Sequence, residues 1–130
     1  MPMTNIQDII KKFPLLFPKG SCECSSSCGE GWLPLLESLL QELTVLLESK
    51  PKKIRDKIYV EQIKEKFGAL RVYLPQCATH DMQEVIVKHE IQSMHICETC
   101  GKRGRLRTGT WWKTRCDACQ KEYEEKPAVR

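Results

Sequence analysis

The most regular alternation of apolar and polar positions lies between residues 32 and 48. The apolar positions recur at helical spacing and are Trp32, Leu35, Leu36, Leu39, Leu40, Leu43, Leu46 and Leu47. The opposite face is polar and holds Glu37, Gln41, Glu42 and Glu48. Pro34 is compatible with the first turn of a helix. The pattern therefore predicts an amphipathic helix over residues 32–48 that packs its leucine face into a core.

Two other segments share this helical period. The first predicts a helix over about residues 4–13, with Thr4 as N-cap, Gln7 completing a capping box and Pro14 ending it; its apolar face is Ile6, Ile9, Ile10 and Phe13. The second predicts a helix over about residues 80–94, with Met82, Val85, Ile86 and His89 on one side.

The segments between these helices have different patterns. Residues 14–31 are rich in Pro, Gly and Ser without a regular period, which indicates a loop, and residues 49–57 look like a linker. β-Branched and aromatic residues around Gly68 predict a β-hairpin over about residues 58–74 that turns near "KFGA". A helix ending at Phe67 is the competing interpretation.

Two pairs of cysteines near the C-terminus predict a metal site in addition to the packed core. Cys97-x2-Cys100 and Cys116-x2-Cys119 are separated by fifteen residues, a spacing typical of zinc sites. A two-residue gap lets both sulfurs of a pair face one ion at tetrahedral geometry. With eight cysteines in a chain that we expect to be cytoplasmic, metal binding is favoured over disulfides. We predict one structural Zn²⁺.

The residues around these pairs predict the local fold of the finger. Gly101 suits a turn that needs positive φ, residues 105–116 indicate a hairpin turning at Thr108-Gly109, and residues after Cys116 are helix-prone. Adjacent Trp111 and Trp112 would point to opposite faces of this hairpin, one of them beneath the zinc. Knuckle, hairpin and helix resemble a treble-clef zinc finger. The predicted class is α+β, with an α+β region at 1–94 and a treble-clef or ribbon-type zinc finger at 95–130.

The same finger argues against catalysis. Four cysteines close the coordination shell, whereas catalytic zinc keeps a position open for water. Treble clefs with His-Asn-His nuclease activity have a histidine between the cysteine pairs, but residues 101–115 contain none. We predict no catalytic residue and a non-enzymatic protein.

A second metal site is a weaker alternative. The segment "CECSSSC" supplies three closely spaced thiols, and a two-residue gap separates another candidate pair downstream. The candidate ligands are Cys22, Cys24, Cys28, Cys77 and His80.

Net charge is +4, and it is unevenly placed along the chain. Residues 51–76 and 97–115 are strongly basic, which predicts contact with a protein partner or with phosphates of a nucleic acid. The candidate contact residues are Lys102, Arg103, Arg105, Arg107, Trp111, Trp112, Lys113 and Arg115 in the finger, and Lys64, Lys66 and Arg71 in the predicted β-hairpin. Basic residues also offset the −2 charge of a zinc tetrathiolate.

Neither the N-terminal segment nor the longest apolar stretch has the pattern of a secreted or membrane protein. The N-terminal segment lacks the apolar core of a secretory signal, and the longest apolar stretch is interrupted by Glu37, Gln41 and Glu42. We expect no membrane partner and a cytoplasmic location.

Four stretches resemble a family of small uncharacterised proteins encoded in bacterial, prophage and phage genomes. They are "CGEGW" at 28–32, "IKEKFGALRVY" at 63–73, "CETCGKRG" and "WWKTRCDAC". The resemblance implies a zinc-containing accessory protein, active in the host cytoplasm if phage-encoded, that binds or inhibits a host protein complex. "CECSSS" and the tail after Gln120 depart from the family. A regulatory nucleic-acid-binding finger that uses residues 102–115 is the alternative.

Overall fold

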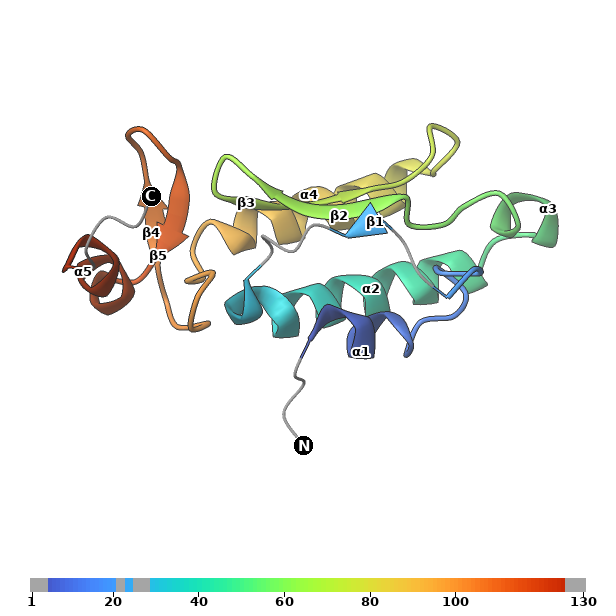
Figure 1. The fold of residues 1–130 in the computed structure, drawn as a ribbon. Helices are drawn as coiled ribbons and strands as arrows, with labels where there is room; N and C mark the ends of the chain where they lie inside the picture. Colours follow the sequence, from blue (N-terminus) through green and yellow to red (C-terminus); the bar gives the residue numbers. More distant parts are fainter. Residues whose placement is uncertain (1–4, 21–22, 25–28, 126–130) are drawn as a thin grey trace.

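The computed structural model describes residues 5–20, 23–24 and 29–125, and it has the α+β composition that the sequence predicts. A three-stranded sheet lies over one long helix, a second long helix runs beside it, and a small finger lies at one end of this body (Figure 1). Among the described helices, none has the length and apolar character needed to cross a membrane.

The first helix, α1 (Ile6–Ile10), is shorter than predicted and begins at a different cap. The side chain of Asn5 accepts a hydrogen bond from the backbone N–H of Asp8 at 3.0 Å, while Thr4 lies outside the described residues. Pro14 disfavours helical geometry at the residue before it. The apolar residues that follow the helix reach the core from tight turns; they are Phe13, Leu16 and Phe17.

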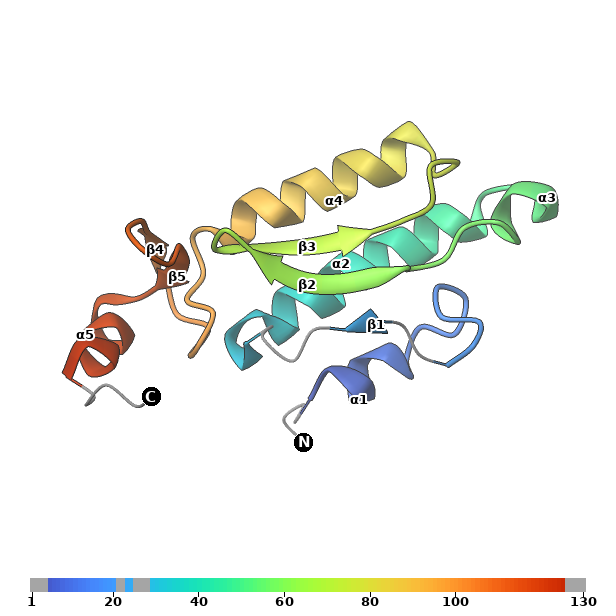
Figure 2. The ribbon, with the colours of Figure 1, turned by 45° about the horizontal axis from the view of Figure 1, so that its top comes forward.

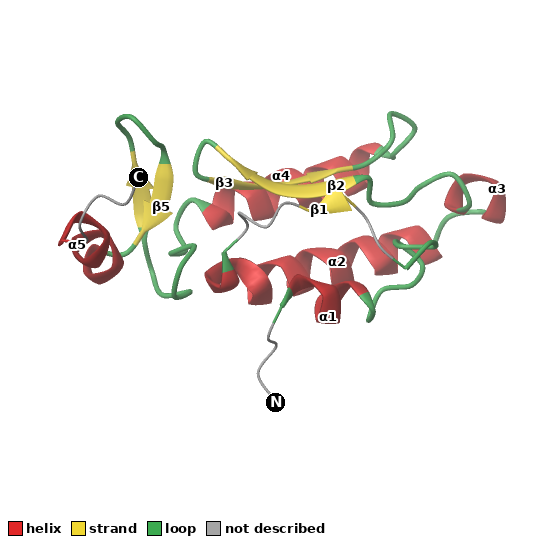
Figure 3. Ribbon diagram, viewed as in Figure 1, coloured by secondary structure: helices red, strands yellow, loops and turns green. Residues whose placement is uncertain are grey.

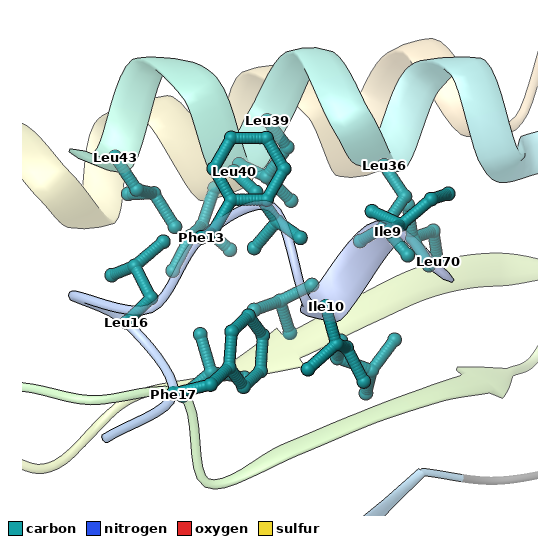
Figure 4. Packing of buried hydrophobic residues seen from close by; sticks show 14 of the residues in the cluster. Ile9, Ile10, Phe13, Leu16, Phe17, Leu36, Leu39, Leu40, Leu43 and Leu70 are labelled. Carbon is teal, nitrogen blue, oxygen red and sulfur yellow. The ribbon is translucent and has the colours of Figure 1, made fainter. Parts of the chain in front are cut away.

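The predicted amphipathic helix is confirmed as α2 (Leu33–Glu48), preceded by the single 3-10 turn η1 (Glu30–Trp32). Its leucines face side chains of the N-terminal segment and of the sheet (Figure 4). The buried positions are Leu33, Leu36, Leu39, Leu40, Leu43 and Leu47. Each fully buried leucine contributes about 1.5–3 kcal/mol relative to exposure, so this face forms the principal wall of the core.

The predicted β-hairpin is also confirmed, and the alternative of a helix ending at Phe67 is wrong. Strand β2 (Gln62–Lys66) pairs antiparallel with β3 (Ala69–Tyr73), and the two-residue strand β1 (Glu23–Cys24), within the predicted loop, pairs parallel with β2. Phe67 and Gly68 have φ values of 54° and 80°, as a type I′ turn requires. The expected linker contains the short helix α3 (Lys52–Arg55).

Helix α4 (His80–Ser93) matches the last predicted helix and packs against α2 and β3. His89 is buried, as its position on the apolar face indicates. Its Nδ1 donates to the carbonyl of Val85 at 2.9 Å, and its Nε2 lies 3.1 Å from a carboxylate oxygen of Glu42 on α2. This histidine therefore ties two helices together.

The finger has the predicted order of knuckle, hairpin and helix. Strands β4 (Arg105–Arg107) and β5 (Lys113–Arg115) are antiparallel, and α5 (Asp117–Glu125) follows directly. The loop between the strands spans residues 108–112 and is wider than the turn at Thr108-Gly109 that the sequence predicts. Figures 2 and 3 show this hairpin beside the turn of the β2–β3 hairpin.

Candidate functional site

The four cysteines of the predicted zinc site converge. Cys97 and Cys100 lie in the knuckle after α4, Cys116 follows β5, and Cys119 lies in the first turns of α5. Their sulfur atoms all lie within 4.8 Å of one another, and they form the only such group of potential metal ligands within the described residues. Cys97 is buried and the other three are at least partly exposed.

The donor set fits a tetrahedral metal ion. With Zn–S bonds of about 2.3 Å, a regular tetrahedron separates neighbouring sulfurs by about 3.8 Å. The Sγ atoms of Cys100 and Cys116 are 3.6 Å apart, close to that separation and far longer than a disulfide bond. The four side chains can therefore hold a metal ion such as zinc.

The acidities of the thiols agree with this use. Burial raises the pKa of Cys97, but backbone N–H groups of Cys116, Cys100 and Thr99 outweigh it and lower the pKa to about 6. A hydrogen bond with Cys116 is the largest of several effects that raise the pKa of Cys119 to about 12. Four thiols in one small volume compete for ionisation, and a divalent cation supplies the charge that lets all of them ionise.

The knuckle has the backbone that the sequence predicts at Gly101. Its φ is 84°, and its N–H donates to the carbonyl of Cys97 at 2.9 Å, while the N–H of Cys97 donates to the carbonyl of Lys102 at 2.7 Å. These bonds close the turn that brings the first two sulfurs together. An isolated β-bridge between Ile96 and Arg103 continues this pairing.

Glu98, between the first two cysteines, joins the finger to the body of the protein. Its carboxylate accepts the backbone N–H of Gly29 at 3.1 Å, and its carbonyl accepts that of Gly31 at 2.7 Å. Lys113 on β5 lies 3.8 Å from Glu98 and 2.8 Å from Glu65 on β2. Burial raises the pKa of Glu98, and the Lys113 ammonium opposes that shift.

Two further contacts complete this junction. The indole N–H of Trp32, which is fully buried, donates to the carbonyls of Ser93 at 3.2 Å and Ile96 at 2.8 Å. The hydroxyl of Thr114, on β5, donates to the carbonyl of Gly68 at 2.7 Å. The metal site is thus continuous with the core on one side and with the β2–β3 turn on the other.

Half of the basic finger side chains that the sequence predicts to contact a partner already interact with other residues of this chain. Arg107 donates to Asp117 at 2.8 Å and to the carbonyl of Arg115, and Lys113 pairs with Glu65. The guanidinium of Arg115 lies over the ring of Tyr123. The other three, Lys102, Arg103 and Arg105, are exposed, although Arg105 has a 3.9 Å contact with Asp117.

The two tryptophans correct a prediction. Neither packs beneath the metal site: both lie in the loop 108–112 rather than on strands, and Trp111 and Trp112 are 75% and 44% exposed. The alternation of strand side chains does not apply to a loop, so both rings face outward. Trp112 contacts Phe67 edge-to-face, with ring centroids 6.2 Å apart.

These aromatics border a hollow of about 1050 Å³ between the β2–β3 turn and the finger loop. Its half-buried lining residues are the apolar Met94 and Leu106 together with the charged Glu65, Arg71 and Lys113. Three exposed aromatic side chains, of Phe67, Trp111 and Trp112, also line it. The lining is Glu65, Lys66, Phe67, Arg71, Met94, Leu106, Gly109, Thr110, Trp111, Trp112 and Lys113.

Phe67 and the aliphatic residues of this hollow were not among the predicted contact residues. The sequence does contain a feature that marks Phe67. It lies directly before Gly68 in a two-residue turn, a position that needs positive φ and favours Asn or Gly. Phe67 is 61% exposed there with φ of 54°. A bulky residue in this conformation costs about 1–2 kcal/mol, so the turn exposes an aromatic ring at an energetic cost.

Only some of the candidate ligands of the predicted second metal site lie within the described residues. Cys22 and Cys28 lie outside the described residues, as does the side chain of Cys24. Cys77 is exposed, and its thiol lies 3.7 Å from the carbonyl of Lys57. His80 pairs with Glu84 at 3.3 Å. Of the described residues, none joins Cys77 and His80 in a cluster of three ligands, and the second site stays a prediction.

Comparisons with protein-family models, with curated protein sequences and with solved structures found no match to this chain.

Proposed function

We propose that this chain is a non-enzymatic, zinc-containing binding module that uses the aromatic hollow to bind a protein. The observation that carries the proposal is the group of three exposed aromatic rings, Phe67, Trp111 and Trp112, around a hollow beside a metal-binding finger. Large exposed aromatics are costly to hydrate and mark interaction surfaces. Trp is also among the residues that contribute most to binding at protein interfaces.

The lining of the hollow favours a protein over a nucleic acid. Met94, Leu106 and the three aromatic rings supply apolar side chains to the lining, which suit a branched or aromatic side chain of a partner rather than a polar base edge. Three of the six finger cations are already engaged within the chain, which leaves fewer charges for phosphates.

The resemblance to phage-encoded proteins supports a host protein as the partner, bound or inhibited in the host cytoplasm. The order of knuckle, hairpin and helix supports a treble-clef finger. In this proposal the zinc ion is structural, because it holds the loop 108–112 against the β2–β3 turn and so keeps the two halves of the hollow in their relative position. The closed set of four thiolates supports the absence of catalysis.

Trp111→Ala is expected to weaken binding of the protein partner by at least about 2 kcal/mol, or roughly thirtyfold in Kd, because it removes the most exposed ring of the hollow. A tagged chain expressed in its natural type of host, treated with nuclease and purified gently, supplies the partner for native mass spectrometry. Kd is then measured between the two purified proteins.

Tyr59→Ala is the matched control, because Tyr59 is also an exposed aromatic but does not line the hollow. Unchanged affinity in Trp111→Ala would contradict a binding site at the hollow. A companion that nuclease removes would instead favour nucleic-acid binding, for which exposed Trp111 offers a stacking surface and Lys102 and Arg103 offer charge. Such binding would weaken steeply between about 50 and about 200 mM salt.

Phe67 allows a test that separates stability from binding. Phe67→Asn and Phe67→Ala both remove the ring, and both are expected to weaken partner binding to a similar degree. Asn tolerates positive φ before Gly68, so we expect the Asn variant to be more stable than the Ala variant by about 1 kcal/mol. Urea denaturation followed by circular dichroism measures the stabilities. A Phe67→Asn variant that binds like the wild type would show that the ring has no part in recognition.

A further inference from the structure

The outer face of the sheet carries a line of three cations that begins at the hollow. The β2–β3 register places Lys64 directly opposite Arg71. Lys66 lies two residues from Lys64 and therefore on the same face. Ile63, Leu70 and Val72, which directly neighbour Lys64 and Arg71 along the strands, are buried on the inner face. Three cations thus share one face of the sheet, with Lys66 exposed and Lys64 and Arg71 half-buried.

Like charges directly opposite each other in a sheet are destabilising, and of these three cations only Arg71 has a carboxylate partner among the described residues. Arg71 contacts Glu90 through Nη1 at 3.0 Å, but its buried Nε has no hydrogen-bond partner. The ammonium groups of Lys64 and Lys66 lie over the rings of Tyr73 and Phe67. No carboxylate of the described residues is within ion-pair distance of either lysine.

This line of charge and the hollow form one continuous surface. Lys66 and Arg71 line the hollow itself, and Lys64 extends the charge along the strands away from it. An occupant that places an apolar side chain between the aromatic rings would therefore bring its neighbouring residues over cations. A carboxylate at those positions would relieve the repulsion between Lys64 and Arg71.

We propose that the occupant of the hollow is a short acidic segment of the partner protein with one large apolar side chain. The apolar side chain packs against Trp111, Trp112 and the aliphatic lining, and carboxylates next to it pair with Lys66, Lys64 and Arg71. The inference rests on the proposed function, which it deepens by naming the chemistry of the partner. The backbone of this partner segment can be extended or helical, because the proposal concerns only its side chains.

A library of random short peptides, displayed and selected on the zinc-loaded wild-type protein, tests the inference. We expect the selected peptides to share an aromatic or branched aliphatic residue flanked by Asp or Glu. The combined variant Lys64→Glu and Lys66→Glu is expected to weaken the selected peptides at least about tenfold, with the loss shrinking at high salt. Replacing their acidic residues with Lys is expected to restore binding to this variant.

Lys53→Glu serves as the control, because it makes the same charge change on α3, at the opposite end of the molecule from the finger (Figure 1). A consensus without acidic residues, or acidic peptides that bind the Lys64→Glu and Lys66→Glu variant normally, would overturn the inference and leave the proposed function standing. Selected peptides that bind Trp111→Ala unchanged would contradict both. Oligothymidylate that binds in place of peptides, and loses affinity in Trp111→Ala, would also overturn both.

Discussion

Cys116→Ser is expected to unfold the finger while most of α2 and α4 keep their structure. Metal binding by small zinc fingers is worth roughly 10–16 kcal/mol, and the finger has little apolar core of its own, since α5 contains no buried residue. Loss of one of four converging thiolates removes most of that free energy. Cys100→Ser is expected to have the same effect.

Metal content by mass spectrometry and limited proteolysis measure this effect. Metal content should fall from one ion per chain, and new cleavage sites should appear within residues 97–125 but not within α2. Cys77→Ser is the control, because Cys77 is an exposed thiol outside the cluster. Unchanged metal content and proteolysis in Cys100→Ser and Cys116→Ser would contradict a structural metal at these four residues.

The same substitution connects stability to binding. Lys113 and Thr114, which lie on β5 just before the ligand Cys116, contact Glu65 and Gly68 of the β2–β3 hairpin. Unfolding of the finger breaks these contacts and removes Trp111 and its neighbour from the hollow. Partner affinity should therefore be lost together with the metal.

Trp32→Ala is expected to lower the free energy of unfolding by about 3–5 kcal/mol. The ring is fully buried, and deleting a buried aromatic side chain leaves a cavity as well as losing apolar burial. It also leaves the carbonyls of Ser93 and Ile96 without the indole donor. Because domains of this size are stable by only about 5–15 kcal/mol, the effect should be plain in chemical denaturation.

Two companion variants separate the causes of this loss. Trp32→Phe keeps most of the volume but lacks the donor, and it should cost about 1–3 kcal/mol. Leu47→Ala makes a cavity at the far end of α2 and should cost about 2–5 kcal/mol. Since Ile96 directly precedes Cys97, we expect Trp32→Ala to lower metal affinity and Leu47→Ala to leave it unchanged. Equal metal affinities in both variants would mean that Trp32 serves the core alone.

Several features of the protein follow from local sequence. The spacing of leucines predicts α2, the pair Phe67-Gly68 marks a turn, and the two cysteine pairs predict a metal site. Each of these patterns acts over a few residues, because helical periodicity, positive φ and ligand spacing depend on near neighbours. The spacing of the cysteines identifies the four metal ligands, on the single assumption that the fold brings the two pairs together.

Where local patterns compete, the sequence was less informative. Asn5 and Thr4 are both acceptable N-caps, so the start of α1 could not be read from residue type. The sequence predicts strand positions for both tryptophans, because the length of the finger loop is not evident from "RTGTWWK". Because β5 begins only at Lys113, both tryptophans lie in the loop before it and both are exposed, whereas strand positions would have placed one ring on each face.

The sequence by itself determined the long helices α2 and α4, the β2–β3 hairpin and the four candidate metal ligands. Only the tertiary structure decided which basic side chains are already paired, where the aromatic rings gather, and how Glu98 joins the finger to the core. Those features depend on contacts between residues far apart in the chain, such as Glu65 with Lys113 and Gly68 with Thr114. Periodicity and motif spacing describe neighbours along the chain, whereas burial and charge pairing are set by neighbours in space.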